Sequence, residues 1–229
     1  MLEDFYFYIS KYTGMNLGRI TVNCPYWVNI IRNNKVVIRG YLNGKGEADI
    51  IKEELVTRLK QKKISSTNLE EIRKFARRER IGIDCSGLAY RLIDKLLSLN
   101  YNGCKINILA DYYKETINRL NANVLTAKQF CIRIFKIKDA QIGDFIRMVG
   151  GRHICVIIKI EKNRLIYLHS SRLTKIQGAH EGEIVIKDRD ADLNKQNWTE
   201  KTIQGQNFGI KYFHLNKEDG IFRLKIFEK

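Results

Sequence analysis

The sequence has few prolines, few tryptophans and no long apolar run. Its 229 residues include Pro 1, Trp 2 and Met 3. No internal repeat, low-complexity segment or linker divides the chain. No segment is apolar for long enough to cross a bilayer, and the first residues lack the basic and apolar regions of a signal peptide. We therefore expect a soluble protein that is cytoplasmic as given, while export to the cell envelope by another route stays open.

Cysteine pairs are also absent. The cysteines are odd in number, widely spaced and without a CxxC pair, which argues against a disulfide framework and against a structural zinc site. We expect reduced thiols and neither a metal nor any other cofactor. The cysteines are Cys24, Cys85, Cys104, Cys131 and Cys155.

Acidic residues are scarce relative to basic ones. Asp plus Glu number 25 against 41 Lys plus Arg, which leaves a formal net charge of +16. Such a charge attracts polyanions: nucleic acid, an anionic envelope polymer or an acidic substrate. The charge alone does not choose among these, and nothing else indicates nucleic acid. The densest basic run, residues 73–80, either steers an anionic substrate or forms the solvated face of a helix.

Hydrophobic periodicity predicts helices in the first half of the chain and antiparallel strands in the second, the order of an α+β fold in one domain over residues 1–229. Thr67 and Glu70 fit a capping box, and residues 100–103 are a stop signal. The expected helices cover residues 2–12, 47–60, 69–76, 88–99 and 108–120. The expected strands cover a hairpin of residues 26–31 and 35–41, and then residues 131–137, 145–148, 153–158, 164–169, 183–187, 210–215 and 221–227.

A short polar turn at residues 82–87 runs directly into a buried helical pattern. Cys85 therefore lies at a helix N-terminus, where unpaired N–H groups and the helix dipole favour thiolate over thiol. The same N–H groups can stabilise an oxyanion. An isolated cysteine is more often a small buried hydrophobe, but this context predicts a nucleophile.

A thiol nucleophile needs a base and a polar group that orients the base. His153 and His169 each lie eight residues from Glu161, on two strands joined near that residue. Because the two strands have equal length on either side of Glu161, the two histidines lie at the same level of a hairpin, as adjacent or diagonal neighbours. We expect His153 to take the proton of Cys85, and His169 to bond the His153 ring and fix its tautomer.

At these motifs the chain resembles the NlpC/P60 cysteine peptidases, a papain-like family that cuts peptidoglycan stem peptides. Four motifs match in order, and in the family they hold the nucleophile, the turn before the base strand, the base and the third catalytic position. They are Asp84-Cys85-Ser86-Gly87, Gly143-Asp144, Arg152-His153-Ile154 and His169-Ser170-Ser171. The resemblance implies a nucleophile helix packed on an antiparallel β-sheet, with Cys85, His153 and His169 as catalytic residues.

A further element, Pro25-Tyr26-Trp27, resembles the Pro-Tyr element of the family, whose Tyr hydroxyl lines the site. The resemblance therefore implies Tyr26 as a substrate-binding residue. In the family this element lies close to the nucleophile, so residues 28–80 are interpreted as an insertion of a hairpin and two helices that can cap the cleft. The resemblance also implies that Asp84 and Ser86 accept the free amino terminus of a substrate, and for Asp84 a structural cap of the helix is the alternative.

The predicted function is a cysteine peptidase or amidase that works through a thioester. By resemblance, its bond is the one between D-glutamate and the diamino acid of a peptidoglycan stem peptide. The alternatives are a cytoplasmic amidase or thioesterase on another substrate, and a catalytically silent module that binds anionic polymers. His180 and His214 have no partner spacing and are expected to be structural or on the surface. A zinc site is disfavoured because no close ligand pair supports it; its ligands would be Cys85, Cys155, His153 and His169.

Overall fold

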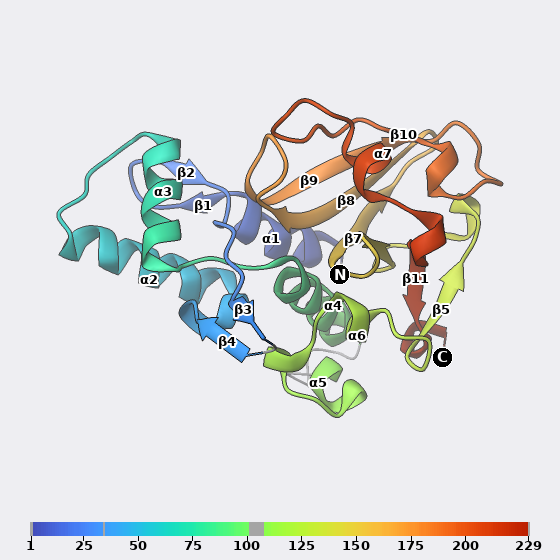
Figure 1. Cartoon of the computed structure of the whole chain (residues 1–229), viewed down its shortest axis with the longest axis horizontal. Helices are drawn as coiled ribbons and strands as arrows, with labels where there is room; N and C mark the ends of the chain where they lie inside the picture. Colours follow the sequence, from blue (N-terminus) through green and yellow to red (C-terminus); the bar gives the residue numbers. More distant parts are fainter. Residues whose placement is uncertain (1, 34, 101–107, 229) are drawn as a thin grey trace.

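Helices packed on an antiparallel sheet form the α+β arrangement expected from the sequence (Figure 1). A computed structural model describes residues 2–33, 35–100 and 108–228. Helix α4 (Cys85–Asn100) packs on strands β7 (His153–Ile160) and β8 (Arg164–Ser171). Helix α1 (Leu2–Thr13) packs on α4 and on β9 (Gly178–Val185). None of the described helices is long and apolar enough to span a bilayer.

The main sheet has seven strands within the described residues, in the order β10-β9-β8-β7-β6-β11-β5. Strands β6 to β9 are neighbours in sequence and in space, whereas β11 lies between β6 and β5, and every pair is antiparallel. A register shift between Ile157 and Lys159 interrupts the β7–β8 pair. The other strands of this sheet are β5 (Cys131–Ile134), β6 (Phe145–Met148), β10 (Asn197–Trp198) and β11 (Gly220–Leu224).

The first half of the chain supplies two small hairpins and most of the helices. The expected hairpin is confirmed in a shorter form by β3 (Ile30–Arg32) and β4 (Lys35–Ile38), and β1 (Met15–Asn16) pairs with β2 (Thr21–Val22). The remaining helices are α2 (Ala48–Gln61), α3 (Leu69–Glu79), α5 (Ile108–Tyr113), α6 (Ala122–Leu125) and α7 (Phe208–Tyr212).

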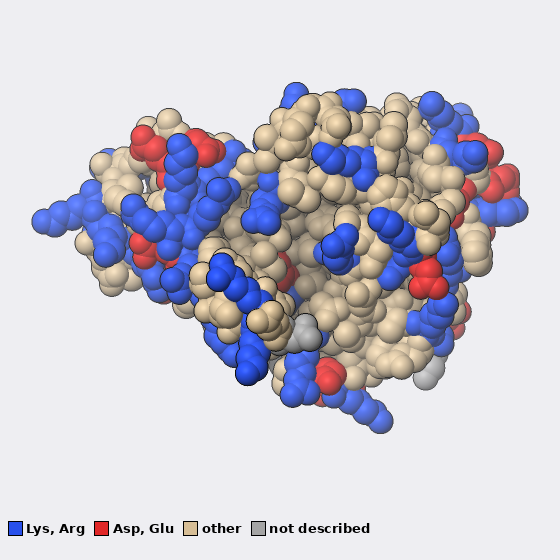
Figure 2. All heavy atoms as spheres, in the orientation of Figure 1, with Lys and Arg blue, Asp and Glu red and all other residues tan. Residues whose placement is uncertain are grey.

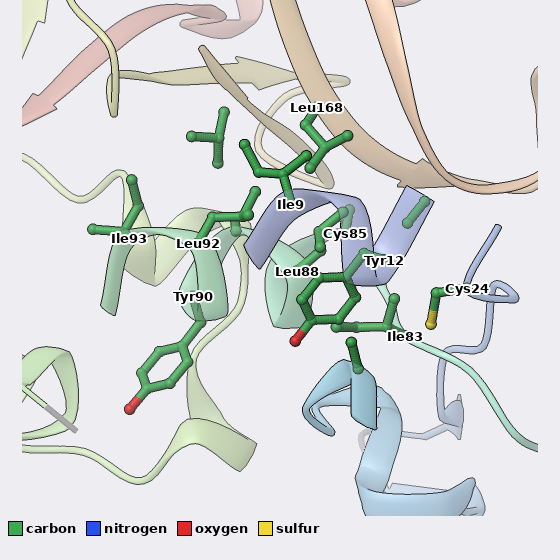
Figure 3. Packing of buried hydrophobic residues seen from close by; sticks show 14 of the residues in the cluster. Ile9, Tyr12, Cys24, Ile83, Cys85, Leu88, Tyr90, Leu92, Ile93 and Leu168 are labelled. Atoms are coloured by element: carbon green, nitrogen blue, oxygen red, sulfur yellow. The ribbon is translucent and has the colours of Figure 1, made fainter. Parts of the chain in front are cut away.

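Apolar side chains cover both faces of the sheet. On one face Leu88 of α4, Ile9 of α1 and Leu168 of β8 belong to one buried cluster (Figure 3). On the other face Tyr167 of β8 packs in a second cluster that includes Phe208 of α7. Successive residues of a strand point to opposite faces, so β7 and β8 contribute alternately to the two cores.

The strand expected over residues 210–215 is wrong. This stretch alternates in polarity, yet residues 208–212 form helix α7. The Asn207 side chain accepts a hydrogen bond from the Ile210 N–H and so caps the first turn. Because a helix of a single turn leaves no periodicity to read, the alternation alone could not exclude it.

Two other local predictions need correction. The N-cap of α3 is Asn68, whose side chain accepts from the N–H groups of Glu70 and Glu71, so the capping box at Thr67 is wrong. The helix expected over residues 108–120 ends at Tyr113. The stop signal continues into residues 101–103, which lie outside the described residues, as does Cys104.

A buried ion pair holds the turn that leads into the sheet. Asp144 accepts two hydrogen bonds from the Arg223 guanidinium, each 2.9 Å long, and both side chains are buried. The turn is also tied to β7, because Gly143 donates to the Ile157 carbonyl at 2.8 Å and Ile157 donates to that of Asp144 at 2.9 Å. The pair therefore links β11, the turn and the strand that begins with His153.

We expect Asp144→Ala to lower the free energy of unfolding by about 3–5 kcal/mol, because it leaves a buried guanidinium without its counter-charge. Urea denaturation of the two proteins measures this change. The control is Glu218→Ala, which breaks an exposed pair with Lys128 and should change stability by less than about 0.5 kcal/mol. Equal effects of the two substitutions would contradict the prediction.

Candidate active site

The Pro-Tyr element at residues 25–27 lies beside the turn at residues 82–87 that leads into α4, although residues 28–80 separate them in the sequence. The Ile83 N–H donates to the Pro25 carbonyl at 2.8 Å, and the Trp27 N–H donates to the Ile83 carbonyl at 3.3 Å. A Cβ on Gly82 would lie 2.3 Å from the Pro25 carbonyl oxygen, so this close approach requires glycine. Residues 28–80 therefore both begin and end beside the site.

Cys85 is the first residue of α4, and Asp84 caps the helix. The Asp84 carboxylate accepts the Gly87 N–H at 2.6 Å and the Ser86 hydroxyl at 3.0 Å. Cys85 is 9% exposed and lines a pocket of about 540 Å³. The structural cap that was the alternative role for Asp84 is therefore present, and Cys85 forms part of the wall of a pocket.

Lys45 places an ammonium group against the same carboxylate. Its Nζ donates to Asp84 Oδ1 at 2.8 Å and also to the Ser86 hydroxyl, and all three side chains are buried. The loop that carries Lys45 rests on α4, since a Cβ on Gly87 would lie 2.4 Å from the Gly44 carbonyl oxygen. Lys45 therefore fills the position in which Asp84 and Ser86 were expected to accept a substrate amine.

The resting thiol differs from the sequence prediction. Burial, followed by the negative charge of Asp84, raises the pKa of Cys85 to about 12, while Lys45 and the N–H groups of Ile154 and Ser86 pull it down. The expected preformed thiolate is therefore wrong for the resting protein: burial outweighs the helix terminus. A base must take the proton from Cys85 when the thiol reacts.

The two histidines of the β7–β8 pair meet as expected. His153 Nε2 and His169 Nδ1 lie 2.9 Å apart. Both rings contact Phe208, which places them in the core beneath α7, whereas Cys85 belongs to the core beneath α4. Among the described residues no hydrogen bond joins Cys85 to the His153 ring. The nearest link is the N–H of Ile154, the next residue after His153, which interacts with the Cys85 sulfur.

Two residues without an expected function complete this polar group. His180 lies opposite His169 in the β8–β9 register, and their Nε2 atoms are 3.0 Å apart. Glu200 Oε1 lies 3.1 Å from His169 Nε2 and 2.7 Å from His180 Nε2. The Tyr167 hydroxyl donates to the other oxygen of Glu200. His180 thus belongs to a buried cluster with His169, and Glu200 was missed because it lies in a polar stretch without periodicity.

The hydrogen bonds of Glu200 determine which ring nitrogens of His169 and His153 carry protons. Burial alone would raise the pKa of Glu200, but the neighbouring His169 and His180 lower it, so the carboxylate is ionised. Burial lowers the pKa of His169 and lowers that of His153 to about 3. An ionised Glu200 accepts from His169 Nε2–H, whose Nδ1 then accepts from His153 Nε2–H. The basic lone pair of His153 is therefore on Nδ1.

The pocket beside Cys85 is lined by polar and basic groups. Tyr26 lines it, and burial raises the pKa of the Tyr26 hydroxyl, helped by Cys85 and Asp84, so the hydroxyl stays protonated. Arg119 and Arg152 also line it. Apolar side chains of the β3–β4 hairpin form another wall of the pocket: they are Val28, Ile31 and Val36.

Comparison of the chain with family models, with curated proteins and with solved structures found no match. The resemblance to the NlpC/P60 peptidases therefore rests on the sequence motifs. Within the described residues, two groups could also hold a metal ion, and both include His169. They are His153, Cys155 and His169, and His169, His180 and Glu200.

The raised pKa of Cys85 predicts how its alkylation depends on pH. Below the pKa the thiolate fraction grows about tenfold per pH unit, so we expect the rate with iodoacetamide to rise continuously between about pH 6 and pH 9. Mass spectrometry of the Cys85 peptide measures the rate separately from the other cysteines. A plateau below about pH 8 would instead indicate an activated thiolate and contradict the prediction.

Proposed function

We propose that the protein is a cysteine hydrolase of the NlpC/P60 type, with a papain-like fold. The observation that carries the proposal is the hydrogen-bonded series from Glu200 through His169 to His153, which ends one residue before Ile154, whose N–H interacts with the Cys85 sulfur. This series supplies two of the three groups that thiol hydrolysis needs, an orienting group and a base, and Cys85 is the nucleophile that we propose as the third. In a histidine ring Nδ1 is the nitrogen nearer the main chain, and this is the nitrogen left with a basic lone pair.

The reaction starts from a neutral thiol and a neutral imidazole. As Cys85 Sγ attacks the amide carbon, its proton passes to His153 Nδ1, and backbone N–H groups at the start of α4, that of Cys85 included, stabilise the oxyanion. The tetrahedral intermediate collapses to a thioester, and the leaving amine takes the proton from His153. Water then attacks the thioester, with His153 again as base, and releases the acid and the thiol. In the structure the His153 ring packs on the α7 side of the sheet and Cys85 on the α4 side, so this transfer requires the His153 side chain to turn towards α4 in the reacting complex.

The pocket favours an acidic peptide as substrate. Its volume of about 540 Å³ lies in the range of small-ligand sites, about 300–1,000 Å³. Arg119 and Arg152 give its lining a net positive charge, because Asp84, the only acidic group among the described lining residues, and Lys45 neutralise each other. A peptidoglycan stem peptide carries the carboxylates that such a surface attracts. We assign the scissile bond to the one between D-glutamate and the diamino acid, as the resemblance implies.

Lys45 prevents Asp84 and Ser86 from binding the amino terminus of a substrate. Its ammonium occupies the acceptor pair of Asp84 and Ser86, so a free amine gains no contact there. The enzyme therefore accepts stem peptides whose amino terminus is still acylated.

The basic surface supports a second candidate, a silent module that binds an anionic polymer. Figure 2 shows Lys and Arg side chains gathered over the part of the molecule that contains α2, α3 and the β3–β4 hairpin. Such a module would bind its polymer with an affinity that falls steeply with salt and would form no thioester. A cytoplasmic amidase or thioesterase would form the thioester but would leave stem peptides uncut.

The nucleophile is tested by Cys85→Ala. Purified peptidoglycan fragments are incubated with each protein, and mass spectrometry identifies the products. Wild type should cut the stem peptide, whereas Cys85→Ala should lose all turnover because no thioester can form. Cys131→Ala removes another buried thiol, which is not among the residues that line the pocket, and should retain activity. Cleavage by Cys85→Ala would sink the mechanism, and circular dichroism shows whether each variant is folded.

The role of Lys45 is tested with a matched pair of peptides, one with a free and one with an acetylated amino terminus. Wild type should cut both with comparable kcat/KM, because neither terminus reaches Asp84. Lys45→Met removes the ammonium and should shift the preference towards the free amine. A preference of wild type for the free amine of roughly 10- to 100-fold, the value of a charged hydrogen bond, would contradict this assignment.

A further inference from the structure

The cluster behind His153 contains one more acceptor than its protons can satisfy. A carbonyl only accepts, so the 2.9 Å contact between His180 Nδ1 and the Gly178 carbonyl oxygen places a proton on Nδ1. A neutral His180 then has a lone pair on Nε2. This lone pair faces Glu200 Oε1, another acceptor, at 2.7 Å. Two acceptors come this close only with a cation between them, either an additional proton on His180 or a metal ion.

We propose that His169, His180 and Glu200 form a binding site for a divalent transition-metal ion, with zinc as the best fit. The three ligand atoms are His169 Nε2, His180 Nε2 and Glu200 Oε1, separated by 3.0, 3.1 and 2.7 Å. Ligands of one tetrahedral zinc lie about 3.3 Å apart, so movements of a few tenths of an ångström admit the ion. Two imidazoles and one carboxylate are a ligand set that zinc uses when a fourth position is left to water.

Each ligand also has the outer partner that a metal site requires. The His180 Nδ1–H donates to the Gly178 carbonyl, and the Tyr167 hydroxyl donates to the second oxygen of Glu200. His169 Nδ1 faces His153 Nε2. Such partners fix the tautomer and the orientation of the ligands.

An ion can reach the site from solvent. His180 and Glu200 line a pocket of about 400 Å³ on the surface of the sheet, separate from the pocket beside Cys85. The charged groups around this pocket balance each other: Lys175 and Lys201 against Glu181 and Glu183. The rim therefore does not repel a cation by excess positive charge.

The site is tested by titrating the full chain, reduced and free of any histidine tag, with Zn²⁺ against a chromophoric chelator. We expect one ion per chain. His180→Ala and Glu200→Gln each remove a ligand and should weaken binding by more than the roughly 10- to 100-fold loss typical of an outer-shell partner. His214→Ala removes the remaining histidine, outside the cluster, and should bind like wild type. Absence of saturable binding, or equal affinity in all variants, would overturn the proposal.

A spectroscopic readout needs no activity and no variant. X-ray absorption of the wild-type zinc complex should show imidazole nitrogen and carboxylate oxygen ligands. A sulfur ligand would place the ion at the group with Cys155 and overturn the assignment. This readout does not depend on substrate turnover, so failure of the proposed hydrolase is distinguished from failure of this site.

Discussion

The candidate site depends on the hydrogen bonds and the ion pair that the buried carboxylate of Asp84 makes. It accepts the Gly87 N–H, the Ser86 hydroxyl and the Lys45 ammonium. Each contact has a different effect: the first starts α4, the second orders its first turn, and the third attaches residues 28–80 to the start of α4. A buried charge is tolerated only when it is paired and hydrogen-bonded, so the position of Cys85 depends on all three together.

Burial determines the charge of both Cys85 and His153. It raises the pKa of Cys85 to about 12 and lowers that of His153 to about 3, so both groups are neutral at rest. The ionised carboxylate of Glu200 then determines which nitrogen of each ring carries the proton. Reactivity in such a site comes from the direction of hydrogen bonds rather than from a preformed ion pair. A neutral pair also limits unwanted alkylation of the thiol before a substrate arrives.

Local rules were sufficient for part of the site. The helix that starts at Cys85 follows from the apolar spacing after a polar turn. The contact between His153 and His169 was expected from equal strand lengths about Glu161, and it is present, although the register pairs Val156 with Leu168 and so makes the two histidines diagonal neighbours. The catalytic roles of these residues stay predictions. The fold class was predicted for the same reason, since helical and alternating patterns occupy separate halves of the chain.

The rest of the site depends on register and long-range contacts that no local pattern records. The strand expected at residues 183–187 begins at Gly178 instead, and only that earlier start pairs His180 with His169. Glu200 reaches the cluster from the neighbourhood of β10, and Lys45 reaches Asp84 from a glycine-rich loop. The preformed thiolate was wrong because a helix terminus can be read from sequence, whereas the depth of burial that opposes it cannot.

Residues 28–80 are therefore part of the candidate site rather than a detachable cap. They bring Lys45, the counter-charge of Asp84, and they return beside the Pro25 carbonyl at Gly82, where only glycine fits. They also supply the apolar wall of the pocket through the β3–β4 hairpin. Because the same segment neutralises the helix cap and shapes the pocket, a change in its length or position would alter the start of α4 and the pocket together. The pocket lining and the turn at residues 82–87 are coupled through Lys45.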